Sequence, residues 1–493
     1  MNRSRQLIRL LGGLLALLMP LGVLAGCGKK GNDPQTPTTE AGPETSGPYD
    51  ENGYINDALP ALNYGGEKLK ILTWNPEYDD LCFTEEDGHG LIEDALFSQH
   101  TRVEKRLGID IQIARSNGRQ EDMDDYLALI TQSNQSGDPF DVIGAYSGIG
   151  AAAAVRGLYR DLNRLPYIDF EKPWWPDDLQ ESIAVGGKLY FGSGDISPNL
   201  IYGLFAIVVN LNMVESHFHD RELIYDLVEN NEWTLDRMIA LSGEIYEDLN
   251  NPGEVDESDA FGFVFCNNVS MDAFLQGSGI SITTKNRNGE LAISSTLYSQ
   301  QCDDVVSKLA TFLKSDSAFV PAKYFGIFPE GRAMLTSAKI SVCVDRLKTA
   351  AFDYGVVPIP KYSSGQKSYI TTMNHHFSAY SVPVVLSDDM AGRSAAFMEA
   401  MGSEGYRSVT PAIFETAFKR KYSESPTVAA MFQLIRDGVR FDMGRLYRLN
   451  FGGDPPDTMF RHAIQQDQKW LTYISSRRGQ WDRILGRISA SLS

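Results

Sequence analysis

The sequence is poor in cysteine, histidine and basic residues. Five cysteines and seven histidines occur in 493 residues, and they form no CxxC or HExxH pattern that would indicate a zinc or redox site. Lys and Arg number 45 against 64 Asp and Glu, giving a formal charge of -19. An acidic surface repels phosphate backbones, so nucleic acid is not expected as a partner. No apolar run reaches the roughly 20 residues that a membrane-spanning helix needs.

The remaining composition is ordinary for a soluble globular protein, with 43% apolar and 22% charged residues. It excludes a collagen-like, mainly disordered or multi-span membrane chain. At about 150 residues per domain, the length is enough for two to four domains.

The first residues read as an export signal. Three arginines and no acid precede an apolar run over residues 10–25, and the run ends in Leu-Ala-Gly-Cys at residues 24–27, similar to a bacterial lipobox. In that type of signal Cys27 is lipid-modified and becomes the first mature residue. We therefore predict a signal peptide over residues 1–26 and an extracytoplasmic protein held to the outer face of the cell membrane by acyl chains. The alternative is an ordinary signal peptide followed by an incidental cysteine.

Residues 27–66 are rich in Gly, Pro, Thr, Asn and Glu, and are predicted to be a flexible tether between this anchor and a folded body. Since residues 1–26 contain only basic charges, the rest of the chain is more acidic than the total, at -22.

The folded body begins with alternating strand and helix patterns. Residues 69–74, 109–113 and 140–145 have strand character, and residues 91–107 and 123–131 between them have helical spacing. This order predicts a parallel sheet with helices on both faces, in which ligands bind beyond the carboxyl ends of the strands.

A second set of alternating segments follows. Strands are predicted at residues 188–191, 206–210, 261–265, 340–344 and 354–358. Helices are predicted after the N-cap Thr234 and at residues 305–313, 391–401, 426–437 and 461–478.

Seven short segments, taken in order, carry a resemblance to a known family. They are LKILTW (69–74), GDPFDVI (137–143), GLYRDL (157–162), GKLYF (187–191), WTLD (233–236), FPEGRAM (328–334) and YGVVPIP (354–360). In this order they resemble the extracellular solute-binding proteins of bacterial ABC importers, of the sugar-binding, maltose-binding-protein-like type. The resemblance implies an α/β, two-lobed periplasmic-binding-protein-like (type 2) fold with a hinge and an interlobe cleft. It places lobe one at residues 67–195 plus 350–385 and lobe two at residues 196–349 plus 386–493.

A sugar-binding cleft needs aromatic surfaces for C–H faces and polar groups for hydroxyls. Candidates are residues at predicted strand ends, at the first crossover and near the hinge: Trp74, Asn75, Tyr146, Ser147, Asp195, Asn267, Asn268, Asp272, Asp345, Arg346, Asn374, His375 and His376.

Structural alternatives remain open for several candidates. They are core packing for Trp74, a turn for the asparagine pair, a surface ion pair for Asp345 with Arg346, and a turn cap for Asp195. The two adjacent histidines also suggest a metal, but they lack a third ligand, so hydrogen bonding is the interpretation.

Other conspicuous residues are assigned structural roles. Trp174 and Trp175 are expected to pack their loop on the lobe, and His217 with His219 to occupy a solvated helix end. Cys266 and Cys343 are expected to be buried thiols, whereas disulfide pairing of these and of Cys82 and Cys302 stays open. Neither a metal nor a cofactor is expected.

The sequence hypothesis is a lipid-anchored, monomeric receptor that delivers a ligand, expected to be a saccharide, to ABC permease subunits without covalent chemistry. One alternative is a secreted carbohydrate-active hydrolase, which needs two carboxylates about 5–9.5 Å apart. Another is a sensor lipoprotein that presents its ligand to a membrane kinase.

Overall fold

The computed structural model describes residues 49, 54–75, 90–250, 253–321, 326–418, 425–453 and 455–493, all within one structural unit, residues 46–493. The predicted signal peptide, Cys27 and Cys82 lie outside the described residues. Within the described ranges, no helix has the length and apolar character to span a bilayer.

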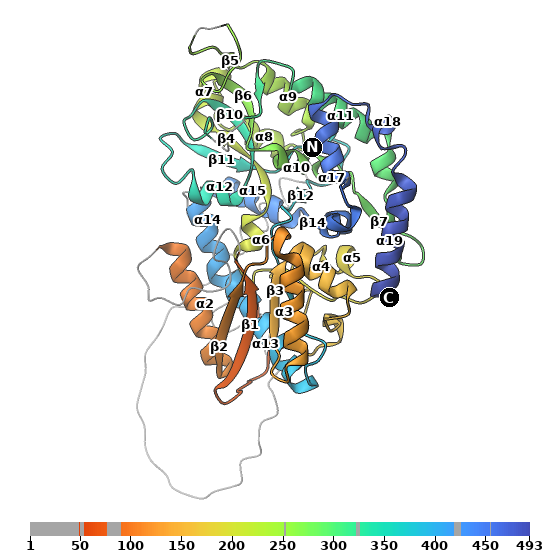
Figure 1. The fold of residues 1–493 in the computed structure, drawn as a ribbon. Helices are drawn as coiled ribbons and strands as arrows, with labels where there is room; N and C mark the ends of the chain where they lie inside the picture. Colours follow the sequence, from red (N-terminus) through yellow and green to blue (C-terminus); the bar gives the residue numbers. More distant parts are fainter. Residues whose placement is uncertain are drawn as a thin grey trace, which may run out of the picture. The chain divides into compact units, whose positions relative to one another are not determined.

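The first sheet has the predicted parallel arrangement (Figure 1). Strand β1 (Glu67–Trp74) pairs in parallel with β2 (Ile109–Ser116) and β3 (Val142–Tyr146), and β13 (Ser378–Ser381) adds to β3 in antiparallel orientation. Helices α2 (Leu91–Leu107) and α3 (Met123–Gln135) confirm the two predicted helices. Parallel pairing brings the ends of β1 and β3 to the same edge.

The second sheet runs in the order β11-β4-β10-β6-β5, and β9 also pairs with β6. Its members are β4 (Phe205–Asn210), β5 (Tyr246–Glu247), β6 (Ala260–Phe265), β9 (Ala318–Phe319), β10 (Ala333–Lys339) and β11 (Tyr354–Val357). Every residue of β4 and β6 is buried, which explains their unbroken apolar sequences, because strands covered on both faces do not alternate.

Further elements surround these sheets. The helices are α4 (Ser147–Val155), α5 (Leu179–Ile183), α6 (Asn199–Tyr202), α7 (Leu211–Phe218), α8 (Leu223–Glu229), α9 (Leu235–Gly243), α10 (Asp272–Gly277), α11 (Gln300–Phe312), α13 (Asp388–Glu404), α14 (Thr410–Phe418), α15 (Pro426–Asp437) and α16 (Met443–Leu446). The short strands β7 (Thr283–Lys285) and β8 (Leu291–Ile293) form one pair, and β12 (Thr371–Thr372) and β14 (Val439–Arg440) form another.

Three predicted elements are wrong. Residues 340–344 belong to helix α12 (Ile340–Asp345), and the strand is the preceding β10, since short apolar runs do not distinguish strand from helix. Residues 188–191 are not a strand: Lys188 forms one isolated bridge with Val185, and residues 189–191 form none. The helix predicted over 461–478 is divided into α17 (Pro456–Gln465), α18 (Trp470–Ile474) and α19 (Arg478–Leu492); Asp467, after α17, has a left-handed φ of 50° that ends helical geometry.

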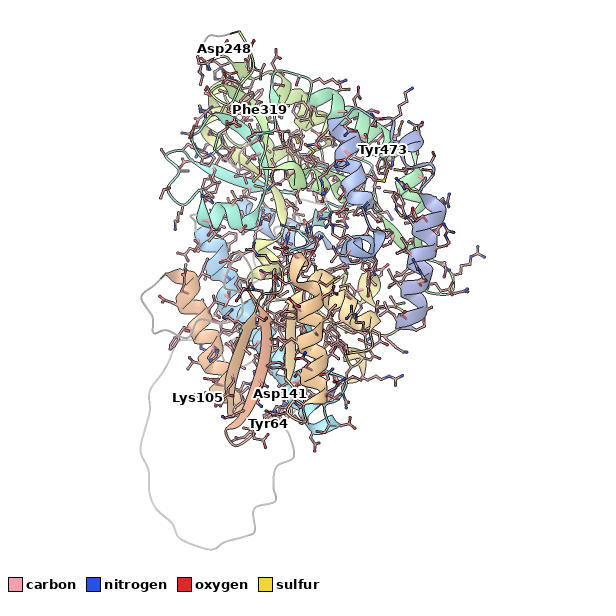
Figure 2. All side chains as sticks on the ribbon, in the orientation of Figure 1. Tyr64, Lys105, Asp141, Asp248, Phe319 and Tyr473 are labelled. Carbon is pink, nitrogen blue, oxygen red and sulfur yellow. The ribbon has the colours of Figure 1, made fainter. Side chains whose placement is uncertain are left out.

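We name the first sheet with its packed helices the first lobe, and the second sheet with its helices the second lobe. The predicted lobe boundaries need correction, because β11 pairs with β4 in the second lobe instead of belonging to lobe one. Conversely, α13 packs on the first lobe, where Arg393 Nη2 bonds Asp141 Oδ1 at 2.8 Å. Asp141 lies just before β3 and is labelled in Figure 2. The order of segments along a chain does not specify which sheet edge each later segment joins.

The folded body also begins earlier than residue 67. Arg106 Nη2 on α2 donates to Asp57 Oδ1 at 2.8 Å, and Asp57 is only 2% exposed. Arg407 Nη2 donates to the Ile55 carbonyl at 2.7 Å, and the Tyr64 amide donates to the Leu107 carbonyl at 2.8 Å. Residues 54–66, predicted to be tether, therefore pack against the first lobe.

Candidate functional site

A cavity of about 280 Å³ lies where the two sheets approach each other. It is lined by residues of both lobes and of the segments that join them: Trp74, Arg119, Asn199, Tyr202, Gly203, Lys339, Asn374 and His376. Trp74 ends β1 and Lys339 ends β10, so the cavity lies beyond the carboxyl ends of strands in both sheets. Three of the predicted site residues, Trp74, Asn374 and His376, line it.

Two connecting segments run side by side at this cavity. The Asn374 amide donates to the Gly203 carbonyl at 2.8 Å, and Leu204 and Met373 form an antiparallel bridge. The Ser378 amide donates to Asn199 Oδ1 at 2.9 Å. Next to Met373, β12 pairs in parallel with β14. In Figure 1, helix α6 of the first of these segments lies between the two sheets. The chain therefore passes between the lobes at one place, as a hinge requires.

Aromatic rings form one wall of the site. The ring centroids of Trp74 and Tyr146 are 5.7 Å apart, and those of Tyr146 and His376 are 5.4 Å apart. Trp74 Nε1 donates to Ser378 Oγ at 2.9 Å. Trp74 is only 1% exposed, so it packs in the core as the structural alternative has it; it also borders the cavity, and its contact with a ligand stays a prediction. Burial raises the pKa of Tyr146 to about 12, keeping its hydroxyl neutral.

The two histidines have different environments. Their rings lie 4.2 Å apart, but His375 is buried and His376 is exposed. Burial first, and then the nearby His376 and Arg448, hold the pKa of His375 well below its usual value. His375 is therefore neutral at pH 7, and His376 is the histidine available to a ligand.

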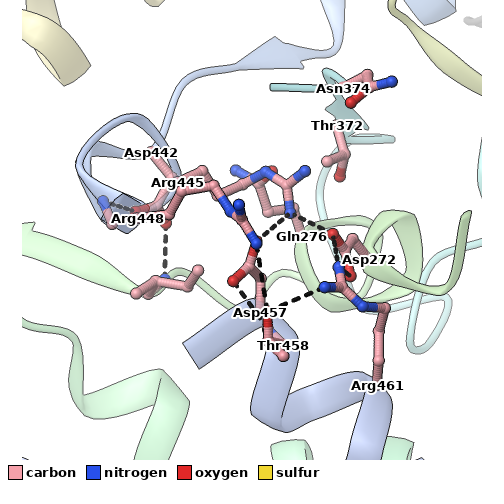
Figure 3. A network of polar contacts seen from close by, with 12 residues as sticks. Asp272, Gln276, Thr372, Asn374, Asp442, Arg445, Arg448, Asp457, Thr458 and Arg461 are labelled. Atoms are coloured by element: carbon pink, nitrogen blue, oxygen red, sulfur yellow. Dashed lines mark hydrogen bonds and ion pairs between the residues drawn. The ribbon is translucent and has the colours of Figure 1, made fainter. Parts of the chain in front are cut away.

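A buried ionic network lies next to this wall (Figure 3). Arg461 Nη1 contacts Asp272 Oδ2 at 2.7 Å, and Arg445 Nη1 contacts the same oxygen at 3.1 Å. Arg448 Nε donates to Asp457 Oδ2 at 3.1 Å. Burial opposes ionisation of Asp457, but the surrounding arginines hold the pKa of its carboxyl below the usual value. The charge of buried Asp442 also acts on Arg445, so three arginines face three aspartates in and beside this network.

The network also links the lobes. Asp272 begins α10, Arg445 lies on α16 and Arg461 on α17, all from the second half of the chain. Arg448 Nη1 donates to Gln120 Oε1 at 3.2 Å, and Gln120 follows β2 in the first lobe. Asp272 was predicted as a ligand-binding residue, but its carboxylate forms ion pairs with two arginines.

The other predicted site residues lie outside the cavity lining. Asn75 is exposed and donates to Asn117 Oδ1 at 3.4 Å, and buried Ser147 donates its hydroxyl to the His375 carbonyl. Asp195 is buried and bonded to Arg436 Nη2 at 2.6 Å, so it joins the first crossover to α15.

The remaining candidates have local structural roles. Asn267 Oδ1 accepts from the Ser270 amide at 3.1 Å, as the turn alternative predicted, and Asn268 begins the short helix η3 (Asn268–Met271). Asp345 ends α12 and Arg346 is its C-cap, so neither follows a strand.

The cavity lining also includes residues that were not predicted as site residues, namely Arg119, Asn199, Tyr202 and Lys339. Lys339 could have been found only by assigning its strand one segment earlier, to residues 333–339. Asn199 and Tyr202 lie on a four-residue helix in the crossover, where no periodicity identifies them.

The residues assigned structural roles behave as expected. Trp174 Nε1 and Trp175 Nε1 donate to the two oxygens of buried Glu399, at 3.1 and 3.0 Å. His217 and His219 are exposed at the end of α7. Cys266, Cys302 and Cys343 are buried, and burial raises the pKa of the Cys343 thiol to about 12. Within the described ranges, no group of three or more His, Cys, Asp or Glu side chains is placed to hold a metal ion.

No protein-family model and no curated protein sequence matches this chain. Solved structures do match this chain. The cyclic α-maltosyl-1,6-maltose binding protein of Arthrobacter globiformis aligns over 86% of this chain and 100% of its own, at 14% identity and a TM-score of 0.57. The maltose/maltodextrin-binding domain MalE of Bdellovibrio bacteriovorus, bound to maltotriose, aligns over 84% and 100%, at 15% identity and a TM-score of 0.51.

The chain has the fold of the maltodextrin-binding proteins. The match confirms the predicted α/β, two-lobed periplasmic-binding-protein-like fold. The same fold includes UgpB of Mycobacterium tuberculosis in complex with glycerophosphocholine, which aligns over 85% of this chain and 98% of its own at 12% identity and a TM-score of 0.54.

Proposed function

We propose that this protein is an extracytoplasmic solute-binding receptor that delivers a carbohydrate-type ligand to the permease of an ABC transporter. The observation that carries the proposal is the cavity between the two sheets, lined from both lobes at the point where the chain crosses between them. Solved members of this fold bind maltotriose, a cyclic maltosyl-maltose and glycerophosphocholine. Fold alone does not specify a ligand, so the argument depends on the site.

The predicted site residues take roles within this proposal. His376 and the edge of Trp74 would contact the C–H face of the ligand, and the Asn374 side chain would bond a hydroxyl. Tyr146 and His375 would support that wall from behind, since both are buried against it. Closure of the lobes about the crossing segments would enclose the ligand and present the closed form to the permease.

Lipidation of Cys27 is part of the same proposal. The export signal and lipobox-like exit support an acyl anchor on the outer face of the cell membrane, with the following segment as a spacer to a monomeric body.

The hydrolase alternative has no support at this cavity. Among its lining residues in the described part of the chain, none is a carboxylate, whereas glycoside hydrolysis needs a pair of them. A sensor would need the same binding site, and stimulation of the cognate transporter's ATPase activity by the loaded receptor would favour import.

Calorimetry with a panel of mono- and oligosaccharides tests the proposal. We expect single-site binding, and a ligand at about 100 times its Kd should raise the free energy of unfolding by about 2.7 kcal/mol. His376→Ala should weaken binding about tenfold, whereas His217→Ala, which removes an exposed histidine on α7, should leave affinity unchanged. Failure of every sugar, with turnover of a glycoside instead, would overturn the proposal.

A further inference from the structure

A second and larger cavity lies on the other side of the connecting segment 373–376. Its volume is about 430 Å³, against about 280 Å³ for the first, and it falls in the range of roughly 300–1,000 Å³ that ligand pockets have. Asn374 and His376 line the first cavity, whereas the alternating Met373 and His375 line a small pocket against residues 440–442. Four residues of that pocket also line the second cavity, and the two large cavities share none. The second cavity is therefore a separate place in the molecule.

Three parts of the chain form the walls of the second cavity. The first is α5, which belongs to the first lobe because Leu179 packs against Gly192, and the Gly192 amide bonds the Tyr380 carbonyl of β13 at 2.9 Å. The second is the end of α10 with strand β7, and the third is the segment 440–443 that follows α15. The cavity thus lies between the first lobe and elements from the second half of the chain.

Hydrogen bonds between these parts hold the walls in place. Lys285 Nζ of β7 donates to the Glu181 carbonyl of α5. The Phe441 amide donates to Asp178 Oδ2 at 2.8 Å, and the amide of the residue before β7 donates to Asp442 Oδ2 at 2.7 Å. The shape of the cavity is therefore set before a solute enters, which lowers the entropic cost of binding.

The charged groups of this cavity balance one another. Its lining has two cations, Lys285 and Arg440, and three acids, Asp178, Glu181 and Asp442. Arg440 Nε lies 3.8 Å from Asp178 Oδ1, and the charge of Glu181 acts on Lys285. Asp442 is buried and accepts hydrogen bonds from three backbone amides and one hydroxyl. Because cations are not in surplus, the cavity offers no preference for an anion.

Several polar groups of the lining keep hydrogen-bonding capacity. Of the three N–H groups of Lys285, the Glu181 carbonyl uses one. Within the described ranges, Arg440 Nη2, the Glu181 carboxylate and the hydroxyls of Ser281 and Thr284 form no hydrogen bond. Donors and acceptors are therefore both available around the same cavity.

This mixture matches a neutral polyhydroxyl solute. Each hydroxyl of a sugar or polyol both donates and accepts, so it needs a carboxylate or hydroxyl acceptor as well as an N–H donor. Ile280, Leu291 and Ile370 add apolar surface to the lining for the C–H groups between the hydroxyls.

We infer that the second cavity is a second solute site, which binds a neutral sugar or polyol. Glu181 would accept from its hydroxyls, and Lys285 and Arg440 would donate to them. This site does not depend on the function proposed for the first cavity. Because Glu181, Ser281 and Thr284 are exposed, their bonds to a solute replace bonds to water, and the expected Kd is about 1 mM. At micromolar solute the second cavity stays empty, and binding is then single-site.

Equilibrium dialysis of the whole protein tests the inference. The probes are radiolabelled glucose, maltotriose, myo-inositol and glycerol, each at about 0.1 to 10 mM. We expect at least one probe to show a weak class of about one bound molecule per protein, which persists in His376→Ala. The Kd of this class should not change between about 0.05 and 0.5 M salt, because the solute is neutral. The four probes distinguish a sugar from a polyol.

Variants of the lining test the residues. Glu181→Gln and Lys285→Gln should each raise the Kd of the weak class about tenfold, and Thr284→Trp should abolish the class by filling the cavity. Arg287→Gln is the matched control, because it removes an exposed cation at the turn between β7 and β8, outside the lining. Unchanged melting temperatures show that the variants fold. If Lys285→Gln does not fold, the two substitutions of exposed side chains, Glu181→Gln and Thr284→Trp, decide the test.

The outcomes separate the two cavities. A weak class that the lining variants lose and His376→Ala keeps supports the second solute site. Binding that His376→Ala weakens and Thr284→Trp leaves unchanged, with no other class, would overturn the second site and leave the receptor function standing. Binding that depends on Thr284 and not on His376 would support the second site and contradict the first cavity as the receptor site. Absence of the weak class for every probe would show a solvent-filled cavity only, and would overturn the inference.

Discussion

Glu399 lies in the interior of the first lobe, where it organises the Trp174–Trp175 pair. Its carboxyl accepts both indole N–H groups and the Asp169 amide, the last at 3.3 Å. Burial raises the pKa of Glu399 to about 8, although these donors oppose the shift. The loop that carries the two tryptophans also contacts the crossover, since the Asp195 amide donates to the Trp174 carbonyl at 2.9 Å.

This burial predicts a pH-dependent stability. The pKa of Glu399 is about 8 in the folded protein and about 4.3 in an unfolded chain, so the folded state holds a proton that the unfolded state has lost. The contribution is complete below about pH 4.3 and disappears as the pH rises through about 8. Urea unfolding should show wild-type stability falling between about pH 5 and pH 8 and levelling off above that, with a shallower fall in Glu399→Gln. The exposed Glu254→Gln is the control, and equal slopes for all three proteins would contradict the prediction.

At the scale of elements, the junction between α13 and α14 fixes the first crossover. The π-helical turn η5 (Gly405–Val409) begins with Gly405, where a Cβ atom would lie 1.8 Å from the Asp195 carbonyl oxygen. Gln99 Nε2 of α2 links the crossover to α13, because it donates to the carbonyls of Ile196 at 3.0 Å and Met401 at 2.7 Å. The crossover therefore touches the turn at a distance that only glycine permits.

Gly405→Ala should destabilise the protein by about 1–3 kcal/mol, because the backbone of two elements must separate. Gly486→Ala is the matched control: it lies on the exposed face of α19 with nothing within 4 Å of the added Cβ, and should stabilise by up to about 1 kcal/mol. Urea unfolding measures both. Equal effects would show that the close approach at Gly405 relaxes without cost.

At the scale of the whole molecule, the two lobes are joined by paired connecting segments and by the contact of Arg448 with Gln120. Such a joint permits rotation of one lobe against the other, because few backbone bonds must change. A ligand can drive closure only by binding the closed form more tightly than the open form.

Small-angle X-ray scattering should therefore give a smaller radius of gyration at saturating ligand than in its absence. His376→Ala at the same ligand concentration is the control, since weaker binding should leave it closer to the ligand-free curve. Identical scattering with and without ligand, at a concentration where calorimetry shows saturation, would exclude closure.

Much of the fold could be predicted from the sequence because it depends on local patterns. The spacing of apolar residues located β1, α2, β2, α3 and β3, and Thr234 was correctly assigned as the N-cap of α9, where its hydroxyl accepts from the Arg237 amide. Trp74, Asn374 and His376 were placed in the site because strand ends and hinge segments are where this fold binds ligands. The buried ion pairs of Asp195 and Asp272 could not be predicted, because a buried ion pair leaves no local sequence signal.

The sequence alone determined the periodicity of the elements, their order and the acidity of the chain, since these are properties of neighbouring residues. Only the tertiary structure decided that β11 joins the second sheet, that Arg119 and Lys339 face one cavity, and that Asp272 is neutralised by Arg445 and Arg461. The physical reason is that contacts between distant segments depend on how sheets and helices pack, and a buried charge takes its partner from whatever that packing brings within reach.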